Sequence, residues 1–497
     1  MDFIKKHLSH RLVIILSYLF IILAGVYGLL TRFSGLFYYV EFKGDQVRDA
    51  WVYMDMLQGV WPTLGPSSSV GVFSLPPLYY YVVFPFTAFS ANPIWQALPN
   101  ALFSFFSIFL LMYLVYQMLN GISYHRKLLL ASFAGFWWSL IFADIYLSAR
   151  EWNPSPTPFF LMVFVLVAHT VFCDKYKKWQ QVCWWIFYGL LIAVLVSLHS
   201  TVWLVIPLVA LVHSIYYIYQ TKKWYLPLVA LIVAFSALTP YWLGEIGRGW
   251  SNTGLLWDTF TQSSDSQHFF MEKIEHTIMA FAQLGKQVYL VDANTPYLAS
   301  IFVYGAFLLF VIFYRGNRKL LSLLILIWVF YFYALSNYWG IIFVHYQLLL
   351  VPAPIIFVVG FLAYVNLNSR RQLVLTFVLL FFVGFSGSSN LQATYQFAKD
   401  ISGQDRLMNI TDKQQALRQA PLQATLCGAE EDISVYQYLD YFLSHRRLNF
   451  SVVCEPGMIA IIPQFSKQHA ERQLFLHNNP KITEELYRNT VFSLVKF

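Results

Sequence analysis

Long apolar runs follow one another along most of this chain, with short polar stretches between them. A helix needs about 20 mostly apolar residues to cross the hydrocarbon core of a membrane, and about eleven runs come near that length. The pattern therefore predicts an all-α polytopic membrane domain with about eleven transmembrane helices. The predicted crossings lie near 12–31, 94–119, 127–147, 157–173, 183–198, 200–219, 225–243, 297–314, 319–336, 347–366 and 372–388.

A further apolar stretch, 76–90, is short and holds Pro76, Pro77 and Pro85. Proline interrupts helical hydrogen bonding, and irregular backbone at membrane depth is tolerated only where protein covers it. We therefore expect this stretch to form an interfacial or re-entrant segment that packs on the rest of the protein.

The pattern changes near the end of the chain, where apolar runs shorten and charged and amide side chains become frequent. Residues 433–446 are patterned as an amphipathic helix, and residues 449–454 and 458–463 as short strands. We therefore expect a transmembrane domain over 1–389, followed by a small soluble α/β domain over 390–497.

Composition supports lipid as the main solvent of this chain. Hydrophobic residues make up 58% and charged residues only 12%, whereas a soluble domain carries about 25% charged residues. The predicted helices place every basic cluster on one side of the membrane, which the positive-inside rule assigns to the cytoplasm. These clusters are Lys5/Lys6/Arg11, Arg126/Lys127, Lys175/Lys177/Lys178, Lys222/Lys223, Arg315/Arg318/Lys319 and Arg370/Arg371.

The other side receives two long outer loops, 32–93 and 244–296, a short turn near 150–156, and the C-terminal domain. The N-terminus is therefore expected in the cytoplasm and the C-terminal domain in the periplasm, across a bacterial inner membrane. The net charge of +8 comes from clusters that flank membrane helices, so it does not indicate a nucleic-acid partner.

The four cysteines fall into two pairs. Cys173 and Cys183 flank a basic loop and are expected near the cytoplasmic face. Cys427 and Cys454 both lie in the expected soluble domain, where they form either a disulfide or two separate thiols. The spacing of cysteine and histidine matches no zinc motif, so we expect no structural zinc.

The first outer loop carries an acidic stretch that is patterned as an amphipathic helix. Asp45 and Asp49 lie one helical turn apart and share a face, with Arg48 and Asp55 near it. Two carboxylates at this spacing repel each other unless a cation or an acceptor hydroxyl lies between them, and a raised pKa would suit a general base. The alternative is a solvated polar face without chemistry.

Two short motifs accompany this acidic stretch on the expected outer side. They are Pro-Pro-Leu-Tyr-Tyr-Tyr at 76–81 and Arg-Glu-Trp-Asn-Pro at 150–154, where the third predicted helix emerges. Together with the acidic stretch at 45–49, they resemble the GT-C superfamily of membrane glycosyltransferases, and within it the ArnT-like and protein-mannosyltransferase-like enzymes. The order of helices, outer loops and soluble domain is similar over nearly the whole chain.

The resemblance implies a single-displacement glycosyltransferase with a polyprenyl-phosphate-linked sugar as donor and a lipid, glycan or protein as acceptor. In this family an acidic residue of the first outer loop activates or holds the acceptor. Asp45 matches the leading aspartate of the family motif, although Gln46 stands where the family often has glutamate. Asp49 is the second carboxylate, so Asp45 and Asp49 are the candidate catalytic residues.

The resemblance leaves a divalent metal open as a cofactor. ArnT-like enzymes often place a lysine before the Pro-Pro-Leu-Tyr-Tyr segment, and a nearby glutamate and histidine have been linked to metal binding. This chain has Phe73-Ser74-Leu75 in the corresponding place, so it lacks both features there and no metal ligand is assigned.

The leaving group of such a reaction is a lipid phosphate, which needs cations at the outer membrane face, and the arginine fork suits phosphate oxygens. Each candidate also has a plainer interpretation: Arg150 as an interface anchor, Arg248 as a loop ion pair, and His345 as a packed histidine. His199 and Asp144, near outer helix ends, either line a cavity or face water. The candidate substrate-binding residues are Arg48, Tyr79, Tyr80, Arg150, Asn153, Arg248, His345 and Tyr346.

Three other classes of membrane protein compete with this interpretation. A transporter or flippase should show broken helices, paired repeats and charges near the bilayer midplane. An O-antigen-type ligase or polymerase also handles polyprenyl-linked sugars, but relies on outer-loop arginine and histidine and needs no acidic pair after the first helix. A structural or signalling protein should tolerate the loss of Asp45 and Asp49.

Overall fold

The computed structural model describes most of the chain. The described residues are 2–38, 40, 42, 44–68, 73–173, 176–262, 270–291, 296–336, 343–366, 369–402, 410–427, 430–444, 448–452, 455, 457–463, 484–488 and 492–496.

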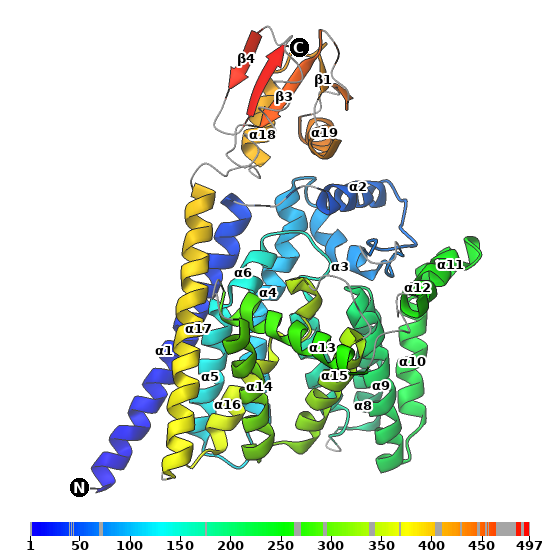
Figure 1. Ribbon diagram of the computed structural model, residues 1–497. Helices are drawn as coiled ribbons and strands as arrows, with labels where there is room; N and C mark the ends of the chain where they lie inside the picture. The colour runs from blue at the N-terminus through cyan, green and yellow to red at the C-terminus, as the bar shows by residue number, and fades with distance from the viewer. Residues whose placement is uncertain are drawn as a thin grey trace.

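A bundle of apolar helices makes up the body of the molecule (Figure 1). Its longest helices have large exposed apolar side chains on one side, such as Ile22 and Leu30 of the first helix, which is the pattern of a lipid-facing surface. The bundle helices are α1 (Asp2–Tyr38), α4 (Pro93–Met118), α5 (Tyr124–Leu140), α6 (Phe142–Ser148), α7 (Thr157–Thr170), α8 (Lys178–Val196), α9 (Ser200–Thr221), α10 (Tyr225–Ala237), α11 (Thr239–Gly247), α14 (Pro296–Phe313), α15 (Arg318–Ser336), α16 (Ala353–Tyr364) and α17 (Arg370–Ser402).

Each predicted crossing coincides with one of these helices or with a bent pair of them. By length and composition, six helices of the described residues are long and apolar enough to cross a membrane, or up to eight if α5 with α6 and α10 with α11 each form one span. The chain is therefore a multi-pass membrane protein, and the total of about eleven crossings stays a prediction. The last predicted crossing, 372–388, lies within α17, which continues to Ser402.

One ion pair is buried between bundle helices. Arg32 of α1 donates to Asp144 of α6 at 2.6 Å, and both side chains are almost fully buried. Ser104 donates to the same Asp144 oxygen at 2.5 Å, and the Ser139 carbonyl accepts from Arg32 at 3.1 Å. Asp144 therefore takes part in contacts between helices and does not line the cavity described below.

Shorter helices cover one end of the bundle. The acidic stretch forms α2 (Asp45–Leu57), as predicted, and the proline-rich stretch forms the short helix α3 (Leu78–Thr87), which packs against α2 and α4. Gly44 precedes α2 with a φ of 46°, a conformation in which glycine avoids the strain of a side chain. The remaining elements are α12 (Ser251–Gln262), α13 (Phe270–Leu284), a π-helix η1 (Gly285–Tyr289) and a 3-10 helix η2 (Val344–Gln347).

The C-terminal part is a small α/β unit beyond this covered end (Figure 1). Its elements are α18 (Ile410–Gln419), β1 (Thr425–Cys427), α19 (Glu430–Tyr438), a π-helix η3 (Leu439–Ser444), β2 (Asn449–Ser451), β3 (Ile459–Pro463), β4 (Glu484–Arg488) and β5 (Phe492–Lys496). The five-stranded sheet has the order β2-β1-β3-β5-β4, with β1 parallel to β2 and β3, and β5 antiparallel to β3 and β4.

Aromatic side chains join this unit to α2. The Tyr438 ring lies 5.2 Å from the ring of Phe42 and 5.8 Å from that of Trp51, centroid to centroid. The Tyr438 hydroxyl donates to the Ala91 carbonyl at 2.7 Å and accepts from the Gln96 amide at 3.0 Å. The C-terminal unit therefore rests on the helix that carries the acidic stretch.

The cysteines follow the expected division. Cys427 is disulfide-bonded, whereas Cys173 and Cys183 are free thiols. Cys454, the partner considered for Cys427, lies outside the described residues.

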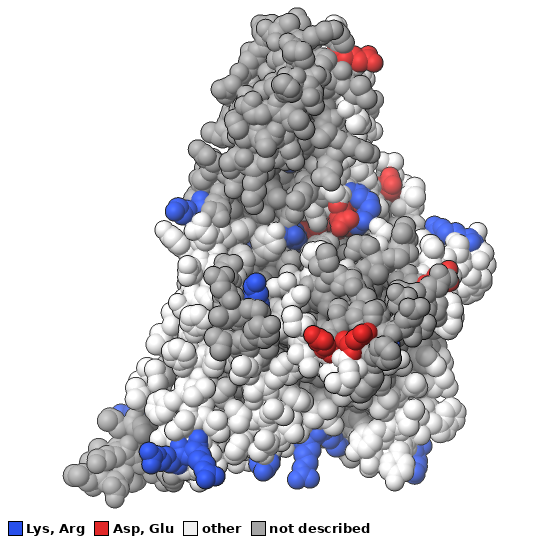
Figure 2. Space-filling view, viewed as in Figure 1, with Lys and Arg blue, Asp and Glu red and all other residues white. Residues whose placement is uncertain are grey.

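The two ends of the bundle differ in charge. We call the end with α2, α3 and the C-terminal unit the acidic end, and the opposite end the basic end. Blue basic side chains gather along the lower edge in Figure 2, and the described residues of the basic-end loops include no aspartate or glutamate. The basic end carries Arg126, Lys127, Lys177, Lys178, Lys222, Lys223, Arg315, Arg318, Lys319, Arg370 and Arg371.

Candidate active site

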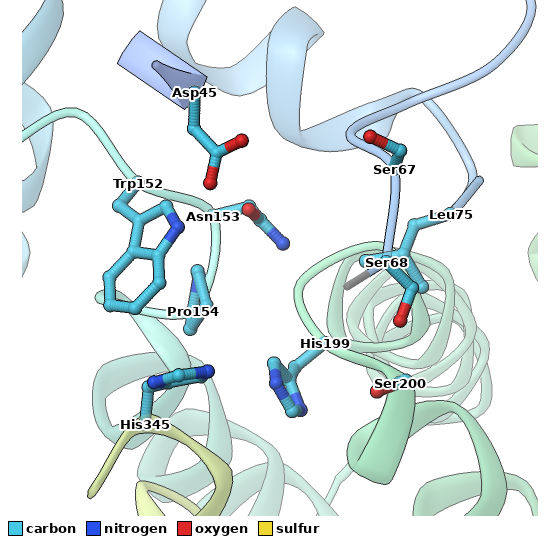
Figure 3. A pocket seen from close by; sticks show the side chains of 10 residues that line it. All are labelled: Asp45, Ser67, Ser68, Leu75, Trp152, Asn153, Pro154, His199, Ser200 and His345. Atoms are coloured by element: carbon cyan, nitrogen blue, oxygen red, sulfur yellow. The ribbon is translucent and has the colours of Figure 1, made fainter. Parts of the chain in front are cut away.

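A cavity of about 130 Å³ lies at the acidic end, where five chain segments meet. Figure 3 shows the Asp45 carboxylate, the Asn153 amide and the rings of His199 and His345 around one common space. The cavity is lined by Asp45, Ser67, Ser68, Leu75, Trp152, Asn153, Pro154, His199, Ser200 and His345.

The two predicted catalytic carboxylates have different surroundings. The Asp45 side chain is 51% exposed and reaches the cavity, whereas the Asp49 side chain is completely buried. The prediction that both lie on one helix is confirmed, but a uniformly solvated polar face is wrong, because α3 packs over the Asp49 side of the helix. Only Asp45 can meet a substrate directly in this arrangement.

Arg48 lies between the two carboxylates. Its Nη1 donates to Asp45 Oδ1 at 2.8 Å, and its Nε donates to Asp49 Oδ1 at 2.8 Å. Nη1 also donates to Ser67 Oγ at 3.0 Å, which ties α2 to the loop that lines the cavity. The Arg48 guanidinium, on the same helix, is therefore the cation that relieves the repulsion between Asp45 and Asp49.

Asp49 acts as an anchor for this arginine. The Tyr80 hydroxyl donates to Asp49 Oδ1 at 2.6 Å, while Oδ2 is buried without a hydrogen-bond partner among the described residues. Burial raises the pKa of Asp49, and the adjacent Arg48 charge opposes that rise. Asp49 is best described as a positioning residue that fixes Arg48, and through it Asp45.

A second buried carboxyl group, Glu151, lies behind the cavity. The Tyr53 hydroxyl donates to Glu151 Oε1 at 2.7 Å, and the Tyr79 hydroxyl also interacts with this carboxyl group. Burial and, secondarily, the negative charge of Asp49 raise the pKa of Glu151 well above its usual value. Glu151 therefore favours its protonated form, which avoids an unpaired charge beside Asp49.

The histidines of the cavity are neutral near physiological pH. Burial, helped by the neighbouring His345, lowers the pKa of His199 to about 3, and burial and Arg150 lower the pKa of His345 to about 4. His199 Nδ1 accepts the Thr201 backbone N–H at 3.2 Å at the start of α9. A neutral His199 therefore carries its proton on Nε2, which makes Nε2–H a hydrogen-bond donor.

Aromatic rings and an arginine support these histidines. The Trp152 ring packs 4.5 Å from the His345 ring, and the Tyr346 ring packs 5.0 Å from the His199 ring, between centroids. The Arg150 guanidinium lies 4.0 Å above the Tyr146 ring and 5.5 Å from the centre of the Trp152 ring. A buried positive charge therefore stands directly behind the cavity wall.

The loop 149–156 is held by amide side chains. The Asn153 amide lines the cavity and donates to the Leu198 carbonyl, which connects this loop to the start of α9. The Asn100 amide of α4 donates to the carbonyls of Arg150 and Trp152 at 2.9 and 3.1 Å, and to the Tyr79 hydroxyl at 3.1 Å. The conformation of this loop is therefore fixed by the membrane helices beneath it.

The cavity brings together only part of the predicted set. Asp45, Asn153 and His345 line it, and Arg48, Tyr79, Tyr80, Arg150 and Tyr346 stand around those residues. Arg248 lies elsewhere, exposed at the end of α11, with hydrogen bonds to Thr63 Oγ1 at 3.4 Å and to the Gly244 carbonyl at 3.3 Å. Residues 337–339, which precede His345 and Tyr346 in the chain, lie outside the described residues.

Sequence reasoning did not assign Glu151 or Trp152 to the site, and it left His199 open between lining a cavity and facing water. Glu151 and Trp152 belong to the Arg-Glu-Trp-Asn-Pro motif, which was a signal, but their roles depend on burial that the motif does not encode. His199 stands at a helix junction, and only the fold brings it to within 5.6 Å of His345, between ring centroids.

The described residues offer no group of three or more His, Cys, Asp and Glu side chains that could hold a metal ion. Leu75 stands in the cavity wall, in the stretch where the resemblance would have placed a metal site. We therefore assign no protein residue of the described chain as a metal ligand.

No protein-family model matches the chain, and no curated protein matches it in sequence. Among solved structures, it is similar to ArnT from Cupriavidus metallidurans bound to undecaprenyl phosphate, with a TM-score of 0.57, 11% identity, and coverage of 95% of this chain and 97% of ArnT. The apo structure of the same ArnT gives a TM-score of 0.54 at 13% identity with the same coverage. At this identity the likeness is one of fold: the chain shares the fold of this ArnT over nearly its whole length, in agreement with the resemblance that the sequence suggested.

Proposed function

We propose that the chain is an integral membrane glycosyltransferase that moves a sugar from a polyprenyl-phosphate carrier to a lipid, glycan or protein acceptor. The observation that carries this proposal is the Asp45 carboxylate, which points into a cavity between neutral histidines at the acidic end of a GT-C fold. The ArnT structure that the chain resembles over nearly its whole length is bound to undecaprenyl phosphate, which supports a donor of this class.

Asp45 is the general base of the proposed reaction. Arg48 occupies Asp45 Oδ1, so Oδ2 is left to accept the proton of an acceptor hydroxyl. The hydroxyl oxygen attacks the anomeric carbon, the bond from that carbon to the phosphate oxygen breaks, and the phosphate leaves with the electron pair. The sugar is transferred in one displacement, and Asp45 later returns the proton to solvent.

The leaving phosphate gains negative charge during this step and needs donors and cations. His199 Nε2–H is one neutral donor at the cavity, and Arg150 supplies positive charge through the wall formed by Trp152 and His345. Arg48 is already engaged by two carboxylates, so its role is to hold Asp45 in the ionised form.

The cellular setting follows from charge and cysteine chemistry. We assign the basic end to the cytoplasm and the cavity with the C-terminal domain to the periplasm of a bacterial inner membrane. The disulfide at Cys427 supports the assignment of the C-terminal domain to the periplasm, because disulfides persist in oxidising compartments.

The test is transfer from a panel of radiolabelled polyprenyl-phosphate sugars by the purified protein, read as released polyprenyl phosphate. Asp45→Asn should lower turnover about 10²- to 10⁴-fold, the usual contribution of a general base. Asp55→Asn is the matched control, because Asp55 is exposed on the same helix and does not line the cavity, so its turnover should stay at the wild-type level.

A parallel arm with EDTA decides whether a divalent metal takes part. If Asp45→Asn keeps full turnover while substitution of His199 or Arg150 abolishes it, the O-antigen-type ligase mechanism replaces this proposal. If no donor is consumed by the folded wild type, a transporter becomes the leading interpretation.

A further inference from the structure

A second cavity, of about 350 Å³, lies between α7, α9 and α15 at the basic end. It shares no lining residue with the candidate active site. Ser200 of α9 lines the first cavity and Tyr216 lines the second, and 16 residues of α-helix span about 24 Å. The two cavities are therefore separate sites at opposite ends of one helix.

The lining of the second cavity is polar at its mouth and mostly apolar further in; the exception is the His213 ring, whose two nitrogens are already bonded to the Tyr188 hydroxyl and the Ala168 carbonyl at 3.1 Å each. Lys319 and Ser322 of α15 lie nearest the helix start, and Leu323 and Leu326 follow on the same face, at the i, i+3, i+4, i+7 spacing. His169 adds a polar ring at the mouth, near the C-terminal end of α7. This order matches an amphiphile with a polar head at the mouth and an apolar tail further in.

The mouth of the cavity is positively charged. The Lys319 ammonium lies 4.9 Å from the centre of the Phe172 ring, and no ion pair of the described residues involves Lys319. No aspartate or glutamate is among the lining residues, and Arg315 and Arg318 are exposed close by in the chain. A negatively charged head group is therefore the complementary ligand.

The cavity opens toward the surface where lipid would lie. Val212 and Tyr216 line it and are exposed, and their neighbours Leu211 and Ile215 on α9 are exposed apolar residues of the bundle surface. A ligand can therefore enter sideways from the surrounding leaflet. The volume falls within the range of about 300–1,000 Å³ that is usual for small-ligand sites.

We propose that this cavity binds an anionic phospholipid of the leaflet at the basic end. Its phosphate lies at Lys319 and Ser322, and the first part of an acyl chain lies along Leu323 and Leu326. Basic pockets between membrane helices are the usual sites for anionic head groups. The site is separate from the cavity proposed for sugar transfer, because the two share no lining residue.

The test is native mass spectrometry of the full-length protein in mild detergent, titrated with phosphatidylglycerol or with phosphatidylcholine. The wild type should bind one phosphatidylglycerol saturably and phosphatidylcholine at least about fivefold more weakly, the effect of about one favourable charge contact. Lys319→Gln should weaken the binding of phosphatidylglycerol about fivefold. Lys222→Gln is the matched control, since Lys222 lies at the same end, over the Tyr219 ring, and does not line the cavity.

A second pair of variants tests the apolar half without changing charge. Leu326→Trp fills the inner part of the cavity and should abolish the saturable phosphatidylglycerol peak, whereas Leu211→Trp places the same ring on the lipid-facing surface and should keep it. If Leu326→Trp does not fold, comparison of Lys319→Gln with Lys222→Gln still tests whether the cavity binds the anionic head group.

Three outcomes would overturn the proposal. Equal loss of binding in Lys319→Gln and Lys222→Gln would show diffuse attraction to a basic surface. Equal binding of phosphatidylcholine would show apolar filling without head-group recognition. Displacement of phosphatidylglycerol by a lower concentration of polyprenyl phosphate would make the cavity a carrier site instead.

Discussion

The two ends of the helix bundle hold cavities with opposite construction. The acidic-end cavity is small, about 130 Å³, and is walled by a carboxylate, imidazoles and hydroxyls that other buried groups hold in place. The basic-end cavity is larger, about 350 Å³, and is mostly apolar, with Lys319 resting on an aromatic ring at its mouth.

The difference fits the function that we propose for each site. A reaction needs groups fixed in one geometry, because misplacement raises the barrier, so each functional side chain at the acidic end has a supporting partner. Lipid binding needs only the right order of polar and apolar surface with depth. A substitution at the acidic end should therefore disturb several neighbouring side chains, whereas the effect of a substitution at the basic end should be confined to the cavity itself.

The largest effect should come from Arg48→Ala. It leaves the buried Asp49 carboxylate without its cation, and loss of one partner of a buried pair costs about 3–5 kcal/mol. We expect about 3 kcal/mol of destabilisation, because the Arg48 side chain is itself 36% exposed. Thermal unfolding of the purified protein measures it, and Arg248→Ala, at an exposed loop position, should change stability by less than about 0.5 kcal/mol. Equal melting temperatures would mean that Asp49 is not held as an anion.

The next effect concerns the histidine donor. His199→Ala should lower kcat/KM about 10- to 150-fold, since a hydrogen bond to a charged group contributes about 1.5–3 kcal/mol. His169→Ala, at the other cavity, should change it less than about twofold. Because the pKa values of His199 and His345 are near 3 and 4, the rate should show no histidine titration between about pH 5 and 8. A histidine step in that range would contradict the neutral imidazoles.

A smaller effect should appear as a pH dependence of stability. The pKa of Glu151 is raised above its unfolded value of 4.5, so its stabilising contribution is complete below about pH 4.5 and is lost as the pH rises toward the folded pKa. In that window, each unit of pH lowers the free energy of unfolding by about 1.4 kcal/mol. Glu151→Gln mimics the protonated acid, so it should melt like the wild type at about pH 4 and higher than the wild type at about pH 9. Parallel melting curves across this range would mean that Glu151 is ionised in the folded protein.

The smallest effect separates the two ends with a pair of serine-to-alanine substitutions. Ser67→Ala removes an acceptor of Arg48 and should slow sugar transfer a few-fold, since a single hydrogen bond contributes about 1 kcal/mol. Ser322→Ala, at the mouth of the other cavity, should leave transfer unchanged. Equal rates for both variants would show that the loop contact does not position Asp45.

The sequence was most informative where local pattern decides structure. Apolar runs predicted the positions of the bundle helices, and the spacing of Asp45 and Asp49 predicted α2, because both depend on neighbours in the chain. In the C-terminal domain, the helix and strands expected over 433–463 were found, as α19 with η3, β2 and β3. Strands β1, β4 and β5 were not expected; β4, for example, reads Glu-Glu-Leu-Tyr-Arg and contains no apolar run.

The candidate site could be predicted only in part. Asp45 was identified because a resemblance pointed to it, but nothing in the sequence distinguishes its exposed carboxylate from the buried Asp49 four residues later. Burial of Asp49 depends on Tyr80, and the pairing of His199 with His345 depends on how α9 and η2 pack. Interactions between residues distant in the chain are set by tertiary structure, which short motifs do not encode.

The contact between Tyr438 and the outer surface of the bundle has a consequence for biosynthesis. Tyr438 bonds to Ala91, which is 347 residues earlier in the chain, and covers Trp51 of α2. At about 5–20 residues per second, a ribosome needs roughly 20–70 seconds to travel that distance. During this interval the membrane helices can insert while the helix bearing Asp45 still lacks its cover. The proposed transfer activity should therefore appear only after the C-terminal unit has emerged.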